Sequence, residues 1–173
     1  LGEAKFMRAF FYFNLVQQFG DVTLSTKFNT EPSRSAHRDD LLDVYELIIK
    51  DLEEASSECL PSPQNNSLES GRASGAAARH LLARAYLTLG WVYDKDPSSY
   101  PNNSHNKYYN PAKAKENYKK AYDVASGLIN DASSLGISLM PSFAAVFDEG
   151  NDAPSGKNKE ELFVARQDWD LDN

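Results

Sequence analysis

The chain has 173 residues, 41% of them apolar, with a formal charge of −7 at pH 7 and a sequence pI near 4.9. This length can bury one hydrophobic core, and the acidic balance argues against nucleic acid as a partner. Cys59 is the only cysteine in the sequence, which excludes an internal disulfide and a cysteine-rich metal site. No apolar run is long enough to span a bilayer.

Residues 3–24, EAKFMRAFFYFNLVQQFGDVTL, predict the first helix. Apolar side chains occur nearly all the way round this helix, and Gly20 stands where a left-handed residue would end it. We therefore expect the helix to be buried on several sides. The side chains expected to pack along its apolar faces are Phe10, Phe11, Leu15 and Phe19.

Arg8 is a charged residue inside this apolar helix. A guanidinium that is removed from water needs a carboxylate or carbonyl partner, which Asp21 or Asp51 could supply. Charges inside apolar helices are usually paired in this way. We therefore expect a structural role for Arg8 rather than contact with a ligand.

Three further helical patterns open near Asp40, Gly75 and Pro111, so the helix starts recur about every 36 residues. This period favours a degenerate helical repeat that is stretched by long loops. Helix pairs of this kind bury their faces by stacking on further pairs, which is typical of a binding scaffold. The expected N-cap residues are Asp39 or Asp40, then Ser74, then Asn110.

Four blocks of the sequence occur in the order found in one known family. They are E-A-K-F-x-R-A-x-x-Y-F-x-L-V-x-x-F-G-D-V-x-L at residues 3–24, V-Y-x-x-I-x-x-D-L-x-x-A at 44–55, G-R-A-S-G-A-A-A-R running into L-L-A-R-A-Y-L at 71–87, and an aromatic and E-E-L-F-V passage at 143–164. Together they closely resemble the N-terminal, tetratricopeptide-like part of the SusD/RagB family of outer-membrane nutrient-binding lipoproteins. Thr23 departs from the usual proline of that family, and this loosens the predicted chain direction after the first helix.

The resemblance implies an all-α fold of tetratricopeptide-like helical repeats with long loops, in a fragment of a larger protein. Residues 1–173 are expected to form helix pairs at about 2–59 and 75–131, followed by a loop-rich part at 132–173. The chain has neither an initiator Met nor a secretory signal. The signal peptide, the lipid-attachment cysteine and the C-terminal half of the family's length are therefore expected to lie outside it.

Residues 91–110 form the most distinctive predicted loop, with aromatic rings beside Asn and Asp. Sugar rings have apolar C–H faces and a rim of hydroxyls, so an aromatic platform flanked by amides and carboxylates suits them. The alternative is an ordinary long polar loop that a few aromatic residues anchor. The candidate ligand-binding residues are Trp91, Tyr93, Asp94, Tyr100, Asn102, Asn103 and, near the end of the chain, Trp169.

Trp91 follows Gly90, where the third helix is expected to end. Its ring can either fold back onto Leu87 or project outward. We favour the inward arrangement, because a lone tryptophan at a helix end usually covers the core. Trp169 lies between aspartates beyond the last apolar run, and it is the better candidate for an exposed ring.

Catalytic and metal-binding patterns are missing from the sequence. The three histidines lie far apart and outside any H-E-x-x-H pattern, and in residues 71–75 the serine stands one place late for a nucleophile elbow. Residues 94–98 have the opening spacing of a calcium loop, but Ser99 and His105 occupy the positions that need Gly and Glu. We expect no catalytic residue, no metal and no cofactor.

The resemblance implies a non-catalytic protein that binds a nutrient, expected to be an oligosaccharide, at the surface of the cell outer membrane. An N-terminal lipid anchor would hold it there, and it would deliver its ligand to a SusC-type TonB-dependent transporter. The alternative is a free-standing helical-repeat adaptor that binds protein partners. An upstream signal peptide with a lipid-modified cysteine would support the first interpretation, whereas a chain that ends near Asn173 would support the second.

Overall fold

The structure is a computed structural model, and it describes residues 1–27, 37–63, 71–147 and 158–163. These residues are helical and irregular, with no strand among them, so the predicted all-α fold is confirmed. The elements in chain order are α1 (Gly2–Phe19), α2 (Leu41–Glu58), α3 (Gly75–Tyr93), the 3-10 helix η1 (Ser104–Tyr108), α4 (Pro111–Asp131) and the short α5 (Phe143–Val146).

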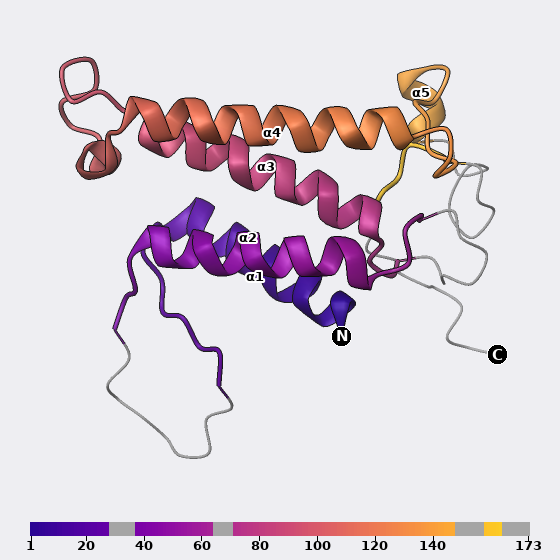
Figure 1. The fold of residues 1–173 in the computed structure, drawn as a ribbon, viewed down its shortest axis with the longest axis horizontal. Helices are drawn as coiled ribbons and strands as arrows, with labels where there is room; N and C mark the ends of the chain where they lie inside the picture. Colours follow the sequence, from indigo (N-terminus) through magenta and orange to yellow (C-terminus); the bar gives the residue numbers. More distant parts are fainter. Residues whose placement is uncertain (28–36, 64–70, 148–157, 164–173) are drawn as a thin grey trace.

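The four long helices form a row in which each packs against the next (Figure 1). Successive helices run in opposite directions, so α1 and α3 run one way and α2 and α4 the other. The loop that carries η1 lies at one end of the row, and α5 lies at the opposite end of α4. This arrangement brings the loop between α3 and α4 close to Asp21 and Asp40, which lie just after α1 and just before α2.

The helix ends follow the local sequence signals. Three cap side chains each accept a hydrogen bond from a backbone N–H of the first turn: Asp40 (2.9 Å), Ser74 (3.1 Å) and Asn110 (3.0 Å). At the end of α1, Gly20 has φ 69° and its N–H donates to the carbonyl of Val16 at 3.0 Å. A positive φ is cheap for glycine and costly for most other residues. The predicted N-caps and the predicted end of α1 at Gly20 are therefore confirmed. Such features can be predicted from sequence because each cap bonds to residues close to it in the chain.

The packing of α1 differs from the prediction. Phe11 and Phe19 are 58% and 60% exposed, and Leu15 is 41% exposed, so α1 is not buried on all sides. The exposed residues are spaced by four, along a face that no described residue covers. The core stripe on the other side is spaced by three and four, and it consists of Phe6, Ala9, Phe13 and Val16.

The chain direction after α1 is fixed without the proline that the resemblance would lead one to expect. Val22 and Asp39 form an isolated antiparallel bridge, in which the N–H of Asp39 donates to the carbonyl of Val22 at 3.0 Å. The Thr23 hydroxyl donates to the carbonyl of His37 at 2.5 Å, and the N–H of Leu24 donates to the Asp39 carboxylate at 2.6 Å. The hydroxyl of Thr23 thus makes a contact that a proline could not make.

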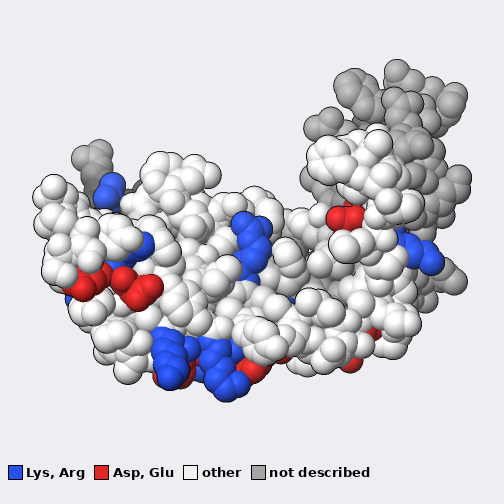
Figure 2. Space-filling model, turned by 90° about the horizontal axis from the view of Figure 1, so that it is seen from above, with Lys and Arg blue, Asp and Glu red and all other residues white. Residues whose placement is uncertain are grey.

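Charged side chains on one face of the molecule occur in separate groups (Figure 2). Figure 2 shows the face that includes α4, where lysine and arginine side chains occur in separate groups with acidic and uncharged residues between them. A continuous basic stripe, which is the usual footprint of nucleic-acid binding, is not visible on this face. None of the helices in the described ranges has the length and apolar character that crossing a bilayer requires.

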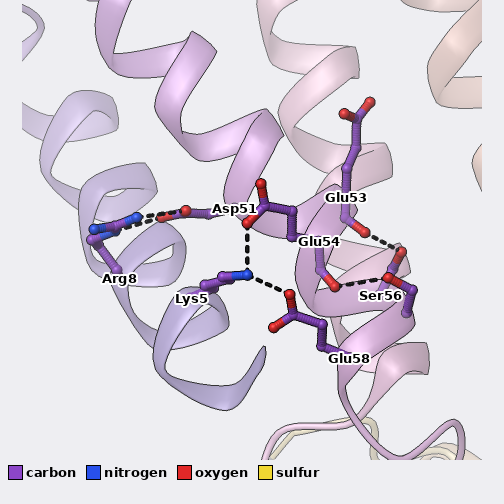
Figure 3. A network of polar contacts seen from close by, with 8 residues as sticks. Lys5, Arg8, Asp51, Glu53, Glu54, Ser56 and Glu58 are labelled. Atoms are coloured by element: carbon purple, nitrogen blue, oxygen red, sulfur yellow. Dashed lines mark hydrogen bonds and ion pairs between the residues drawn. The ribbon is translucent and has the colours of Figure 1, made fainter. Parts of the chain in front are cut away.

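A polar network joins α1 to α2 (Figure 3). Arg8 donates to the two carboxylate oxygens of Asp51, from Nε at 2.6 Å and from Nη2 at 2.7 Å. Nearby, the Lys5 ammonium lies 2.7 Å from Glu54 and also pairs with Glu58. Of the two carboxylates that the sequence offers to Arg8, the structure uses Asp51. The pair joins α1 to α2, which is the structural role that the sequence predicts.

Candidate functional site

The candidate site lies where α3 ends and the loop to η1 begins. The helix does not end at Gly90 but continues to Tyr93, so Trp91 belongs to its last turn. Gly90 is buried, and a Cβ atom there would lie 2.6 Å from the ring of Tyr118 on α4. This glycine therefore permits a close helix contact and does not terminate α3. The loop closes where the N–H of Asn110 donates to the carbonyl of Tyr93 at 2.8 Å.

Trp91 and Tyr100 share one cation. The ammonium of Lys95 lies 3.6 Å from the ring centre of Trp91 and 4.5 Å from that of Tyr100, and Lys95 is only 6% exposed. The faces of aromatic rings attract cations, so these contacts hold the two rings in place. Trp91 remains 44% exposed and Leu87 is also exposed. The prediction that Trp91 folds inward onto Leu87 is therefore wrong, because the ring packs against Lys95 and His105 of the loop instead.

His105 lies on another side of Trp91. The two ring centres are 5.7 Å apart with an interplanar angle of 66°, and the ring of Tyr108 lies 6.4 Å from that of His105. Burial lowers the pKa of His105, and the negative charge of Asp21 partly opposes this effect. The Nδ1 atom of His105 is buried without a hydrogen-bond partner in the described part of the chain. A neutral imidazole is therefore the form that this environment favours.

Tyr108 and Lys107 attach the loop to the first helix pair. The Tyr108 hydroxyl donates to Asp40, the N-cap of α2, at 2.8 Å. The ammonium of Lys107 lies 3.4 Å from Asp40 and 3.6 Å from Asp21. Burial and the neighbouring Asp40 raise the pKa of Tyr108 to about 12, against the opposing effect of Lys107. The loop is thus closed at its ends by the Asn110–Tyr93 bond and attached to the first helix pair near its C-terminal end.

The polar residues predicted for the site differ in their exposure and in their hydrogen bonds. Asp94 is exposed and accepts a hydrogen bond from the Tyr118 hydroxyl at 3.3 Å, while Asn102 is exposed on the loop. Asn103 uses its side-chain oxygen to cap η1, accepting from the N–H of His105 at 2.8 Å. Asp94 and Asn102 therefore present polar atoms to solvent, whereas Asn103 serves mainly to shape the loop.

Two of the predicted aromatic residues do not join this surface. Tyr93 is buried at 8% exposure and has the ammonium of Lys113 5.3 Å from its ring centre. Trp169 lies outside the described residues. Of the predicted aromatic residues, the structure therefore brings Trp91 and Tyr100 together.

Metal binding finds no support in the loop geometry. Asp96, in the segment that resembles a calcium loop, accepts from the N–H and the hydroxyl of Ser98, both at 2.8 Å. This contact closes a local turn. Within the ranges that the structure describes, no group of three or more His, Cys, Asp and Glu side chains could hold a metal ion.

Sequence reasoning missed the cation that organises the site. Lys95 stands four residues after Trp91, and this spacing brings side chains together on a helical turn. That spacing was the available signal for the Trp91–Lys95 contact. No local pattern indicated the bond between Tyr108 and Asp40, because these residues are 68 positions apart. Chemically, the loop offers two half-exposed rings held around a cation, with a carboxylate and an amide beside them.

Comparison with known proteins shows which family the chain resembles. The family model that matches is SusD-like, described as "starch-binding associating with outer membrane", and it covers residues 1–87, half of the chain. SusD-like protein P2 of Formosa agariphila is 29% identical over 164 residues, which are 94% of this chain and 26% of that protein. The chain therefore spans about a quarter of the length of this curated relative.

Solved structures share the fold. A laminarin-binding SusD-like protein has a TM-score of 0.68 and 24% identity, over 94% of this chain and 29% of the other. A structure described as containing a xylogluco-oligosaccharide has a TM-score of 0.68 and 23% identity, over 94% of this chain and 28% of the other. With half of its length matched by the family model and its helical arrangement shared by these structures, the chain belongs to the SusD-like family.

Proposed function

We propose that this chain is part of a non-catalytic glycan-binding protein that associates with the outer membrane. The family description names starch binding and outer-membrane association, and two proteins of similar fold are described with laminarin and with a xylogluco-oligosaccharide. In this proposal the ligand is an oligosaccharide. The protein is held at the cell surface by an N-terminal lipid anchor and delivers its ligand to a SusC-type TonB-dependent transporter.

The Trp91 loop is the proposed contact surface within this chain. The observation that carries the proposal is the pair of half-exposed rings, Trp91 and Tyr100, fixed around Lys95. Lys95 covers part of the surface of each ring. A sugar ring would therefore pack on the surfaces of Trp91 and Tyr100 that remain exposed to solvent. Exposed Asp94 and Asn102 would bond hydroxyls at its rim.

The helical row would serve as the scaffold for this loop. We propose that the pairs within residues 2–59 and 75–131 act as two repeats, with residues 132–173 following them. Three contacts support the role of the first pair in presenting the loop: Tyr108 and Lys107 with Asp40, and Lys107 with Asp21. Substituting Asp21 or Asp40 would therefore alter the position of the loop that carries the proposed sugar-binding surface.

A glycan array tests the proposed ligand class. The protein, applied to an array of neutral and acidic oligosaccharides, is expected to bind a defined set of glycans, and mass spectrometry should recover those glycans uncleaved. Cleaved products would mean that the protein is an enzyme. Failure to bind any glycan, together with specific binding to a protein partner, would favour the helical-repeat adaptor.

A further inference from the structure

A second surface lies on the row of helices, and Tyr93, at the start of the loop, is one of the residues that line it. It is a furrow of about 600 Å³ between α2 and α4. Figure 1 shows α3 between these two helices, and α3 packs against both. Tyr86, Leu89 and Tyr93, spaced by three and four along α3, form the floor of the furrow. Two helices running in the same direction therefore form its walls.

The two walls carry opposite charge. The α2 wall presents the carboxylates of Asp43, Glu46 and Glu53 together with one lysine. The α4 wall presents the ammonium groups of Lys113 and Lys120 and no carboxylate. The furrow therefore has an acidic edge and a basic edge on either side of its floor.

Several of these charges are not neutralised internally. Among the described residues, Asp43, Glu46 and Lys113 form no ion pair. By contrast, Lys120 pairs with Glu116 at 2.7 Å, and Glu53 accepts from the Tyr86 hydroxyl at 2.8 Å. Each wall thus keeps at least one charge that a ligand could meet.

The floor does not suit a sugar ring. Tyr93 and Tyr86 are 8% and 7% exposed, whereas Trp91 and Tyr100 of the loop are 44% and 49% exposed. The tyrosine faces are therefore not open platforms. The aliphatic side chains that line the furrow are Leu42, Ile49 and Leu89.

We propose that this furrow binds an amphipathic helix of a partner protein. Such a helix would place an apolar strip on the half-buried side chains of Leu42 and Ile49, acidic residues toward α4 and basic residues toward α2. A helix lying in a groove uses one apolar face, and charges along its edges give specificity more than affinity. Nucleic acid would be repelled by the acidic wall, and an uncharged glycan would gain nothing from two oppositely charged walls. This inference does not depend on the proposed glycan binding.

Three synthetic helical peptides with the same apolar strip test the charge argument. One carries glutamates on one edge and lysines on the other, one carries glutamates on both edges, and one carries lysines on both. Because a helix can enter the furrow in either direction, exchanging the two edges would not be a useful control. Fluorescence anisotropy with the 173-residue chain should show tighter binding of the mixed-edge peptide, by roughly fivefold over either of the others. Absence of measurable binding by all three, or equal binding, would overturn the proposal.

Charge-reversed variants complete the test. Lys113→Glu should shift the preference toward the peptide with lysines on both edges, and Glu46→Lys should shift it toward the peptide with glutamates on both edges. Lys115→Glu changes an exposed lysine of α4 outside the furrow and should leave the preference unchanged. Circular dichroism confirms that each variant is folded. If Lys113→Glu changed oligosaccharide binding and not peptide preference, the furrow would be a sugar site and the inference would be wrong.

Discussion

Arg8 holds Asp51 by both carboxylate oxygens across the interface of α1 and α2. The two side chains differ in their access to water, because that of Asp51 is 2% exposed and that of Arg8 is 39% exposed. A buried charge that loses its partner is costly, whereas an exposed one can be solvated again. The energetic consequences of removing either partner should therefore be unequal.

Substituting Arg8 should destabilise the protein more than substituting Asp51. Arg8→Met leaves a carboxylate buried without its partner, which should cost about 3 kcal/mol of unfolding free energy. Asp51→Ala leaves a guanidinium that can turn toward water, with a cost of about 1–2 kcal/mol. Urea denaturation of the two single variants and of the double variant measures these costs. Equal losses would show that burial does not control the energetics of the pair.

The two sides of α1 predict different responses to truncation. Phe13 is 3% exposed, so Phe13→Ala should remove about 3–5 kcal/mol of unfolding free energy. Phe11 is 58% exposed, so Phe11→Ala should change it by less than about 1 kcal/mol in the 173-residue chain. Chemical denaturation of both variants tests the face assignment, and a large loss for Phe11→Ala would mean that this face is covered.

Gly90 and Gly127 offer a matched test of the α3–α4 contact. A Cβ at position 90 would meet the Tyr118 ring at 2.6 Å, so Gly90→Ala should cost about 1–3 kcal/mol despite the better helix propensity of alanine. At position 127 the nearest atom is the end of the Arg79 side chain at 3.2 Å, and Gly127→Ala should be neutral or stabilising. Thermal melts of both variants measure these effects. A higher melting temperature for Gly90→Ala would contradict the close contact between Gly90 and Tyr118.

The lowered pKa of His105 predicts a loss of stability in mild acid. A histidine in an unfolded chain titrates at about pH 6.5, while burial holds the folded His105 neutral to lower pH. The unfolded state therefore binds a proton first, and stability falls as the pH decreases from about 6.5 through the lower folded pKa. Asp21 acts in the opposite direction, and Lys107 and Lys95 add to the effect of burial.

Thermal melts between pH 8 and pH 5, for wild type and His105→Gln, measure this dependence. The variant should lose the part of the pH dependence that His105 contributes. Fluorescence provides a local reading, because Trp91 lies 5.7 Å from the imidazole and a charged imidazole there should quench its emission. Identical pH profiles for the two proteins would show that His105 does not titrate as its burial suggests.

The features predicted correctly from the sequence are those that neighbouring residues determine. Asp40, Ser74 and Asn110 cap helices through bonds to residues two or three positions away. Arg8 needed a carboxylate because of its position in an apolar helix, although the choice of Asp51 over Asp21 required the fold. The all-α arrangement followed from the helical periods and from the family resemblance together.

The incorrect predictions have physical causes that a single sequence does not display. Apolar side chains occur nearly all the way round α1, so the sequence does not show which face packs, and Phe11 was expected inside. Gly90 was interpreted as a helix end, whereas it makes room for Tyr118 from another helix. The position of Trp91 depends on Lys95 and His105, which the loop places around it. The predicted glycan role of this loop remains a prediction.

Titration with oligosaccharides tests the central claim that the Trp91 loop contacts a glycan. Laminari- and xylogluco-oligosaccharides are titrated into wild type, Trp91→Ala, Tyr100→Ala and Trp169→Ala, with binding followed by calorimetry and folding by thermal melts. Aromatic contacts commonly contribute about 0.5–1.5 kcal/mol, so we expect Trp91→Ala to weaken binding by roughly three- to tenfold while the thermal melt still shows a folded protein. Equal affinity of wild type, Trp91→Ala and Tyr100→Ala for a glycan that binds would contradict the claim.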